Sequence, residues 1–338
     1  MFTVVSTCNI PFVVDERVFD KVKGIRYVNK PCHSEEAITA VAASASAVVV
    51  GHEPFTRKVI DGLTDCRLLV TPKTGYDNID VAAATEKGIC VSNVSGASTE
   101  EASDQTMALL LACARKLFKE DKAVRAGQWK SIHGPEMEAI WRGILPLRGR
   151  TLGLIGFGKI PRGLVPKAKG FSLKILVYDP FVSDDLLHEN GVERRELNQL
   201  LVESDFVSIH CALTRDNYHL VGREQIKFMK RSAYLINTAR GPLVDEKALY
   251  DALVGGAIAG AALDVLEVEP VRMDNHLLQL DNVIITGHSG HYSDLAIATI
   301  RRRPAEDVER VMNGQWPISW INPEVKTKYI SRWGDKNR

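Results

Sequence analysis

Three polar side chains that can do chemistry stand just past three apolar runs of the chain. Arg240 follows AYLINTA, Glu269 comes shortly after AALDVL, and His288 follows NVIITG. A guanidinium holds a carboxylate through two parallel hydrogen bonds, and a histidine paired with a carboxylate acts as a general acid or base. The trio predicts a site that grips an anion and moves a proton. A surface ion pair for Arg240 and a purely structural His288–Glu269 pair are the alternatives.

A glycine-rich turn that suits a dinucleotide lies in the same half of the chain. Gly156-Phe157-Gly158 follows the apolar run TLGLI and precedes a helical pattern. In that context a backbone turn and a helix N-terminus bind a pyrophosphate. Pro161 stands where the third glycine of GxGxxG is usual. Proline suits the first turn of a helix, but a close helix–strand contact is lost, and Gly163 is expected to restore part of it.

An acidic residue follows the glycine turn at the distance expected for nucleotide recognition. Asp179 ends the apolar run KILVYD, about 20 residues beyond Gly156. A carboxylate there would bind the hydroxyls of the adenosine ribose and repel the extra phosphate of NADP. The sequence therefore predicts NAD as the cofactor. The alternative is that Asp179 caps the next helix.

Short apolar runs alternate with amphipathic stretches along the chain, which is typical of parallel strands joined by crossover helices. The pattern restarts at TLGLIGFG. It predicts an α/β protein with two doubly wound parallel sheets, Rossmann-like or flavodoxin-like. The strands predicted first are FTVVST, AVVVG, CRLLVTP and ICVSNV, and those predicted second are TLGLIGFG, KILVYDP, DFVSIHC, AYLINTA, IAGAALDV and NVIITG. Ligands of such sheets bind beyond the carboxyl ends of strands, where Arg240 stands.

The domain boundaries follow from two helical patterns. A capping box at Ser98 and Glu101 begins a long helix that enters the second domain, and a helical pattern over 292–312, kinked or split by Pro304, returns to the first. We therefore predict a discontinuous substrate domain and a central NAD-binding domain. Their ranges are 1–98 with 295–338, and 99–294. The final residues, 326–338, are polar and basic and are expected to be loosely ordered.

An arm of irregular pattern lies at about 117–150 and carries Trp129 and Trp141. Exposed aromatic side chains in such an arm predict a contact between two copies of the chain. Packing of the arm on its own chain is the alternative.

Composition excludes several classes of protein. The net charge of the 338 residues is +1, which offers no domain-scale basic surface for nucleic acid. The longest apolar run, 107–114, is too short to span a bilayer, and the N-terminus does not resemble a secretory signal. The six cysteines form no CxxC, so we expect reduced thiols, no metal site and a cytoplasmic protein.

Several motifs together resemble the D-isomer-specific 2-hydroxyacid dehydrogenase family. They are NTARGPLVDEKAL, AALDVLEVEP, HSGHYSD and TGYDNIDVAAATEKGICVSNV. Within the family, STEEASDQTMALLL, YDPFVSDD and GHSGHYSD are most similar to the C-terminal-binding-protein branch. The resemblance spans about residues 45–325. It implies two Rossmann-like domains with the active cleft between them, and a homodimer held through the arm.

The resemblance also implies roles for matching residues. Arg240 would bind the carboxylate and carbonyl oxygen of a 2-oxo acid, His288 would be the acid/base, and Glu269 would support His288. The residues implied to bind the cofactor are Thr74, Gly156, Gly158, Lys159, Ile160, Asp179, Cys211, Thr214, Thr238, Ala239, Asp264, His288 and Gly290. Those expected on the substrate are Arg240, His288, Lys73, Thr74, Gly75, His52 and His291.

The chain departs from the family pattern in places that affect the substrate. Gly287 replaces a frequent proline before His288, which predicts a looser loop. His291 stands where the branch has a tryptophan, and Thr71 where it has an arginine, which Lys73 could replace. These residues predict a polar or anionic substrate rather than a large apolar one.

The expected function is NAD-dependent hydride transfer between nicotinamide and a small 2-hydroxy or 2-oxo acid of D configuration. An NAD-gated scaffold is one alternative, since the branch includes transcriptional corepressors, but a scaffold has no need of the Arg240, Glu269 and His288 trio. A dehydrogenase of a phosphorus oxyanion such as phosphite is the other, and Lys73 keeps it open.

Overall fold

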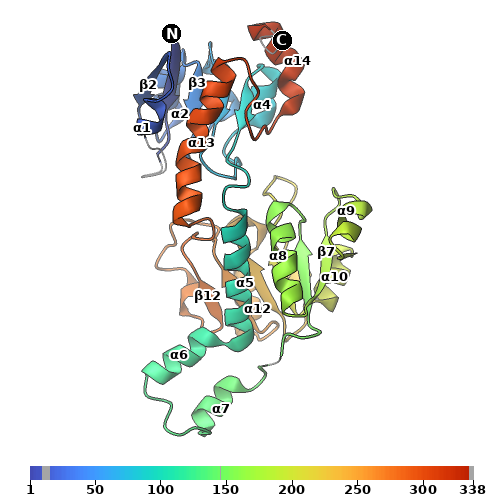
Figure 1. Cartoon of the computed structure of the whole chain (residues 1–338). Coiled ribbons are helices and arrows are strands. Elements are labelled where there is room, and N and C mark those ends of the chain that lie inside the picture. Colours follow the sequence, from blue (N-terminus) through green and yellow to red (C-terminus); the bar gives the residue numbers. More distant parts are fainter. Residues whose placement is uncertain (10–15, 145, 335–338) are drawn as a thin grey trace. The chain divides into compact units, whose positions relative to one another are not determined.

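The computed structural model describes residues 1–9, 16–144 and 146–334, and the chain divides into two compact units (Figure 1). Unit 1 is Met1–Ser98 with Ser293–Arg338, and unit 2 is Thr99–Tyr292. Each contains one parallel sheet, which confirms the predicted fold class. Parts of the predictions for the N-terminus, the arm and the C-terminal segment fall on 10–15, 145 and 335–338, which lie outside the described residues.

The sheet of unit 1 has five parallel strands in the order β2-β1-β3-β4-β5, the flavodoxin-like order. Its strands are β1 (Phe2–Ser6), β2 (Ile25–Asn29), β3 (Ala47–Val49), β4 (Leu68–Val70) and β5 (Cys90–Ser92). Strands β3, β4 and β5 are fully buried because helices cover both faces of the sheet. Strand β2 was not predicted. It lies at the edge of the sheet, where its mixed burial gives it no apolar run.

The helices of unit 1 form two layers with separate cores. One layer has α2 (Glu35–Ala42), α3 (Arg57–Gly62) and α4 (Val81–Glu86). The other has α1 (Glu16–Phe19), α13 (Asp294–Met312) and α14 (Lys326–Trp333), with the 3₁₀ helix η3 (Pro323–Val325) before α14.

Two parts of the expectations for the C-terminal region are wrong. Helix α13 is continuous through Pro304, which is buried, so the predicted split does not occur, while a kink there stays a prediction. Residues 326–333 form helix α14 rather than a loose tail. Tyr329 lies in the core there, and the Arg332 guanidinium donates a 2.6 Å hydrogen bond to the Lys87 carbonyl. Tyr329 and Trp333 lie four residues apart and both pack on the core. Two aromatic side chains in so short a segment are too few to stand out as an amphipathic pattern in the sequence.

The sheet of unit 2 has seven parallel strands in the order β12-β11-β10-β9-β6-β7-β8. This is the Rossmann order with one further strand. The strands are β6 (Thr151–Ile155), β7 (Lys174–Tyr178), β8 (Glu193–Arg194), β9 (Phe206–Ile209), β10 (Tyr234–Asn237), β11 (Gly260–Leu263) and β12 (Val283–Ile285). Six were predicted, and only the two-residue edge strand β8 was not.

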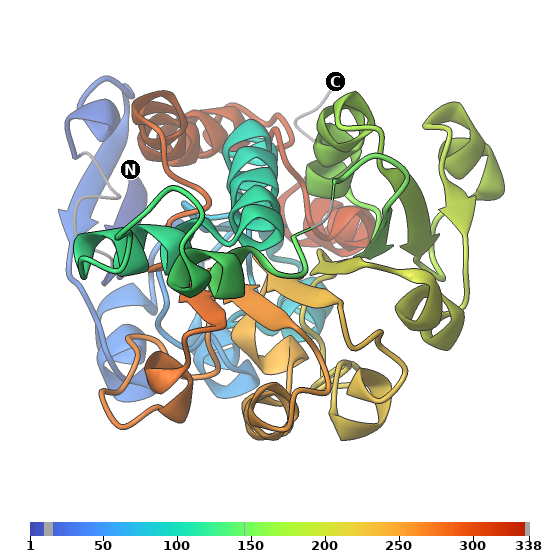
Figure 2. The same ribbon diagram turned by 90° about the horizontal axis from the view of Figure 1, so that it is seen from below.

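Helices lie on both faces of the unit 2 sheet (Figure 2). On one face are α5 (Thr99–Arg115), α8 (Lys159–Gly170) and α9 (Asp184–Glu189). On the other are α10 (Leu197–Glu203), α11 (Arg223–Ile226) and α12 (Glu246–Val254). The short helices η1 (Gly241–Leu243) and η2 (His276–Gln279) follow β10 and β11.

The arm extends from α5 as two helices, α6 (Leu117–Arg125) and α7 (Pro135–Trp141) (Figure 1). It has a small core of its own, to which Trp141 belongs, and the Trp141 indole donates to Glu120 at 2.9 Å. Trp129 is 57% exposed. The two tryptophans therefore differ, because Trp141 is partly buried against its own chain and Trp129 is largely exposed.

Within the described ranges, no cluster of three or more His, Cys, Asp or Glu side chains is arranged to hold a metal ion. No helix there combines the length and apolarity needed to cross a membrane.

Candidate functional site

The unit 2 sheet changes winding direction at β6, and open α/β sheets bind ligands at such a switch point. Strand β6 pairs with β7 on one side and β9 on the other. Directly after β6, Gly156 has φ +93°, and a Cβ atom there would lie 2.7 Å from the Cys211 nitrogen. The position requires glycine both for its left-handed backbone and for this close approach.

The second glycine of the turn leaves open space at the start of a helix. Gly158 is the N-cap of α8, and nothing lies within 4 Å of where its Cβ atom would stand. Lys159 and Ile160 are the first two residues of α8. The first amides of an α-helix have no acceptor within the helix, so a glycine turn of this shape suits a pyrophosphate.

The Asp179 carboxylate lies against this turn. Its Oδ2 accepts a 2.7 Å hydrogen bond from the Phe157 N–H, and its Oδ1 accepts one of 2.9 Å from the Phe181 N–H. The alternative interpretation, a cap for the next helix, is wrong because Ser183 caps α9. Asp179 is therefore positioned beside the glycine turn, as a ribose-binding role requires.

Arg194 supports the loop that follows Asp179, and sequence reasoning missed it. Its guanidinium donates to the carbonyl oxygens of Asp179 at 2.6 Å and Val182 at 2.7 Å. A third contact joins it to Asp184 at 2.7 Å. Arg194 lies on β8, the short edge strand that gave no apolar signal, so its approach to Asp179 depends on a strand the sequence did not reveal.

The expectation for Gly163 is wrong. Pro161 is buried in the first turn of α8, as predicted. A Cβ atom on Gly163, however, would contact Thr99 and Ser103 of α5 at 3.5 Å, not the strand. The small residue therefore serves the packing of α8 on α5, and it does not replace the missing third glycine.

The loop after β9 borders the glycine turn through its backbone. Cys211 is half-buried, and burial raises the pKa of its thiol to about 11, so the thiol is neutral. The Thr214 N–H donates to the Asn217 side chain at 2.7 Å. The structure brings Cys211 next to Gly156, whereas Thr214 lies further along an exposed loop.

Arg240 is carried by an extended segment that Asn237 holds in place. Asn237 is buried at the end of β10, its side chain donates to the Arg240 carbonyl at 2.8 Å, and it accepts from the Ala239 N–H at 3.0 Å. The hydroxyl of Thr238 lies 2.9 Å from that of Thr106. The apolar run thus ends in a turn whose shape is set by one buried amide, and this turn presents Arg240 at the carboxyl edge of the sheet.

A second histidine–carboxylate pair braces the same region. His219 Nε2 lies 3.0 Å from Glu267 Oε1, and the His219 N–H donates to the Pro242 carbonyl at 2.8 Å. Glu267 Oε1 also accepts from the Glu246 N–H at 2.9 Å. This network links the segment after Arg240 to the segment before Glu269, and no sequence motif predicted it.

Glu269 and His288 form the predicted pair. His288 Nδ1 lies 2.7 Å from Glu269 Oε2, and Glu269 Oε1 accepts from the Leu266 N–H at 3.0 Å. Burial opposes ionisation of Glu269, but the hydrogen bond and charge of His288, the Leu266 amide and the charge of Arg240 together lower its pKa. Because Nδ1 faces the carboxylate, Nε2 is the nitrogen that can exchange a proton with a substrate.

Asp264 fixes the His288 loop. It is only 2% exposed, and its carboxylate accepts hydrogen bonds from the Thr286 hydroxyl at 2.5 Å, the Ser289 N–H at 3.0 Å and the Gly290 N–H at 2.9 Å. Its carbonyl accepts from the His288 N–H at 2.8 Å, where His288 has φ +54°. The loop that Gly287 was expected to loosen is therefore tied down by a buried carboxylate.

His291 lies beside the acid/base pair. Its ring meets that of His288 edge-on, with centroids 6.1 Å apart. Burial and the neighbouring His288 lower the pKa of His291. A neutral imidazole next to His288 keeps the surroundings polar without adding charge.

Unit 1 gathers its predicted substrate-side residues at the carboxyl edge of its own sheet. His52 follows β3, and Lys73, Thr74 and Gly75 follow β4, the neighbouring strand. Lys73 Nζ donates to the Asn78 side chain at 2.7 Å. Thr71, where the branch has an arginine, is fully buried, so the substituted position faces the interior of unit 1.

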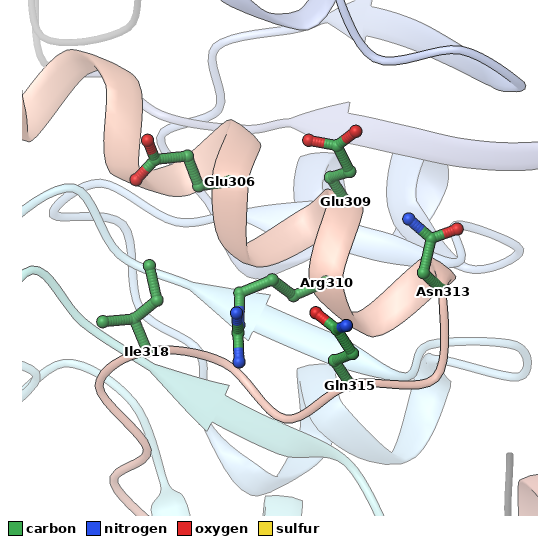
Figure 3. Close-up of a pocket in the computed structure, with 6 residues that line it drawn as sticks. All are labelled: Glu306, Glu309, Arg310, Asn313, Gln315 and Ile318. Carbon is green, nitrogen blue, oxygen red and sulfur yellow. The ribbon is translucent and has the colours of Figure 1, made fainter. Parts of the chain in front are cut away.

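A hollow of about 360 Å³ on unit 1 does not involve these residues (Figure 3). Glu306, Glu309, Arg310, Asn313, Gln315 and Ile318 line it. Arg310 already donates to the Trp316 carbonyl at 2.8 Å, and Glu306 pairs with Arg302. None of the predicted site residues lines this hollow.

Comparisons with known proteins agree with this geometry. Residues 107–290 match the family model described as D-isomer specific 2-hydroxyacid dehydrogenase, NAD binding domain. A glyoxylate reductase of Korarchaeum cryptofilum is 42% identical over 273 residues, which cover 81% of this chain and 81% of that protein. A D-3-phosphoglycerate dehydrogenase of Methanocaldococcus jannaschii is 39% identical over 302 residues, which cover 88% of this chain but 56% of that longer protein.

Among solved structures, the D-lactate dehydrogenase of Aquifex aeolicus, complexed with NAD and lactic acid, has a TM-score of 0.80 to this chain. It is 28% identical, and the match covers 92% of this chain and 96% of that one.

Proposed function

This chain belongs to the D-isomer specific 2-hydroxyacid dehydrogenase family, and we propose that it interconverts a small D-2-hydroxy acid and its 2-oxo acid through Arg240, Glu269 and His288. It is an NAD-dependent oxidoreductase. The observation that carries the proposed mechanism is the 2.7 Å contact between His288 Nδ1 and Glu269 Oε2.

Arg240 binds the carboxylate of the 2-oxo acid and polarises its carbonyl. The Asn237 amide holds the segment that carries Arg240, and a planar guanidinium suits a carboxylate. As negative charge develops on the carbonyl oxygen, the fixed positive charge of Arg240 stabilises it.

His288 supplies the proton. NADH, when bound, supplies the hydride. In reduction, protonated Nε2 donates to the oxygen that becomes the hydroxyl, and in oxidation it takes that proton back. Glu269 holds Nδ1 and stabilises the imidazolium. Asp264 keeps His288 in its left-handed backbone conformation, and its expected contact with the cofactor stays a prediction.

The glycine turn and Asp179 hold the cofactor. Gly156 and Gly158 allow the pyrophosphate to approach the start of α8, and Asp179 binds the adenosine ribose. The Asp179 carboxylate accepts hydrogen bonds from two backbone N–H groups, which fix it beside the glycine turn. A carboxylate held there supports a preference for NAD over NADP. The other contacts expected on the cofactor are Thr74, Lys159, Ile160, Cys211, Thr214, Thr238, Ala239 and Gly290.

The substrate is a small, polar 2-oxo acid, and glyoxylate is the first candidate. The relative from Korarchaeum cryptofilum is named a glyoxylate reductase. His52, Lys73 and His291, three of the residues expected on the substrate, are polar, which favours a small polar substrate over one with a large apolar side chain. Phosphite remains an alternative substrate to be tested, because Lys73 could also bind an inorganic anion. The finer resemblance to the C-terminal-binding-protein branch, and a scaffold role with it, stays a prediction.

The protein forms a homodimer through its arm in this proposal. Several large apolar side chains of the arm are exposed, which is unusual for a surface that stays in water. They are Leu117, Phe118, Val124, Trp129 and Ile132. None of the six cysteines forms a disulfide, which fits a reducing compartment such as the cytoplasm.

Arg240→Ala tests the assignment of the anion-binding residue. We expect turnover of glyoxylate to fall about 10²–10³-fold, while NADH binding, read by fluorescence titration, persists. Arg223→Ala, an exposed arginine on α11, serves as the matched control. Loss of NADH binding in Arg240→Ala would show that the residue has another role.

A further inference from the structure

The loops that follow neighbouring strands of unit 1 share one hydrogen-bond network, and a buried carboxyl lies within it. Glu53 is 1% exposed. Its Oε1 accepts hydrogen bonds from the Thr7 hydroxyl at 2.7 Å and the Gly51 N–H at 2.8 Å. Its Oε2 has no hydrogen-bond partner among the described residues.

This network connects the ends of three adjacent strands. Thr7 follows β1 and Gly51 follows β3, so Glu53 joins these two strand ends directly. The Asn78 side chain donates to the carbonyl oxygens of Gly51 at 3.1 Å and Glu53 at 2.7 Å, and it accepts from Lys73 Nζ at 2.7 Å. Asn78 therefore ties the loop after β3 to the loop after β4.

The network reaches a fourth strand through a second asparagine. The Asn93 side chain donates to the Thr74 carbonyl at 2.6 Å, and the Val94 N–H donates to the Lys73 carbonyl at 3.2 Å. Asn93 follows β5, the neighbour of β4. The backbone on which His52, Lys73 and Thr74 stand is thus held from both sides.

We propose that Glu53 is a positioning residue for substrate binding, which fixes the Gly51–His52 backbone and, through Asn78, the Lys73–Gly75 loop in the arrangement that receives the 2-oxo acid. This inference rests on the proposed function, because it concerns the same substrate. Glu53 acts through the loops and does not touch the substrate itself.

The surroundings of Glu53 favour its neutral form. Burial raises the pKa of Glu53, although the hydrogen bonds from Thr7 and Gly51 oppose that shift. The groups around it are Thr7 and Asn9 beyond β1, the Cys32 thiol beyond β2, His52 on its own loop, and Lys73, which is held at Asn78. None of the described contacts places a cation on Oε2, so ionisation would leave a buried charge that only hydrogen-bond donors stabilise.

The sign of the pH effect follows from this shift. A carboxyl group whose pKa is raised by folding stabilises the fold fully below the ordinary glutamate range, and this contribution is lost as the pH rises through the raised value. Ionised Glu53 would loosen the two loops. The KM for the 2-oxo acid should therefore rise at alkaline pH.

The experiment compares Glu53→Gln and Glu53→Ala with the wild-type enzyme, using glyoxylate and NADH across a pH series. Glutamine retains the Oε1 acceptor and cannot ionise, so its KM should stay near the wild-type value and rise less steeply at alkaline pH. Alanine should raise KM by about tenfold or more because the loops shift. The Kd for NADH should be unchanged in both variants. Glu86→Gln, at an exposed glutamate of the same unit, is the matched control.

Several results would overturn the proposal. They are an unchanged KM in Glu53→Ala, a Glu53→Gln variant as impaired as Glu53→Ala, or a KM of Glu53→Gln that rises as steeply at alkaline pH as that of the wild type. If Glu53→Ala does not fold, Thr7→Val removes one donor to Oε1 and should still raise KM, whereas an unchanged KM would overturn the role. A wild-type enzyme without turnover of any 2-oxo acid would overturn the proposed function as well. Wild-type turnover with unaffected Glu53 variants would overturn only the role of Glu53.

Discussion

Gly241 lies directly against the peptide bond that Leu266 shares with Glu267, so that a Cβ atom at Gly241 would overlap the Leu266 carbonyl. Gly241 follows Arg240, and the Leu266 N–H donates to Glu269. Arg240, which we propose binds the substrate, and the Glu269 carboxylate beside His288 are therefore held by two segments in backbone contact. The relative position of these two segments depends on residue 241 being glycine, which has no side chain.

Replacing Gly241 with alanine should separate these segments. The added methyl group must push the Leu266 peptide away, which moves Glu269 relative to Arg240. We expect kcat/KM to fall by about 10²-fold, the cost of misplacing catalytic groups by roughly 1 Å. Steady-state kinetics would measure this, with NADH affinity as a second readout. Gly170→Ala, at a helix end with open space around it, is the control, and full activity in Gly241→Ala would refute the coupling.

The pH dependence of kcat/KM should depend on the negative charge of Glu269. Its lowered pKa means that the ionised form stabilises the fold above the ordinary glutamate range, and that this contribution is lost as the pH falls through the lowered value. In Glu269→Gln the negative charge beside His288 is absent, so the protonated imidazole is less favoured. The alkaline limb of kcat/KM for reduction should move to lower pH, and kcat should fall. An unshifted limb would mean that His288 is not the proton donor.

Asp179→Ala should narrow the preference for NADH over NADPH. The carboxylate that repels the extra phosphate would be gone, and the Phe157 and Phe181 amides would lose their acceptor. We expect the ratio of kcat/KM values for the two cofactors to fall by about tenfold or more, mainly through weaker use of NADH. Asp185→Ala, an exposed acid on α9, should leave the ratio unchanged. A wild-type preference for NADPH would contradict the assignment.

The arm should control the oligomeric state. Phe118 is 60% exposed and Ile132 is 71% exposed, and burying them between two copies would favour association. Phe118→Ser with Ile132→Ser should shift a dimer toward monomer in sedimentation or light-scattering measurements at equal concentration. Phe171→Ser, an exposed aromatic at the end of α8, should have no such effect. A monomeric wild-type protein would contradict the dimer.

The parallel sheets could be predicted because their central strands are buried on both faces and read as unbroken apolar runs. Edge strands β2 and β8 could not, since half of their side chains face water. Helix α14 was missed for a related reason, because its apolar face is short and consists of Tyr329 and Trp333. The local pattern of apolar residues indicates which elements are buried. Elements with little buried surface therefore cannot be predicted from it.

Much of the candidate site could also be predicted, because glycine, acidic and basic residues that occur together at the carboxyl ends of parallel strands indicate a ligand-binding site. The pairing of His288 with Glu269 was expected from sequence, and so was the nearness of Asp179 to the glycine turn. The residues that fix the positions of these side chains could not be predicted. Glu53, Asn78 and Arg194 act across loops distant in sequence, and a buried polar contact between loops leaves no periodic signal.

The most direct test of the account is the initial rate of NADH oxidation by the purified protein with glyoxylate, compared between wild type and His288→Ala. Pyruvate, hydroxypyruvate, a branched-chain 2-oxo acid, a dicarboxylate and phosphite (the last with NAD) complete the panel. The account predicts turnover by the wild type and a rate about 10²–10⁴-fold lower in His288→Ala, with NADH bound equally well by both. Equal rates in the two proteins, or no turnover of any 2-oxo acid by a wild type that binds NADH, would contradict it.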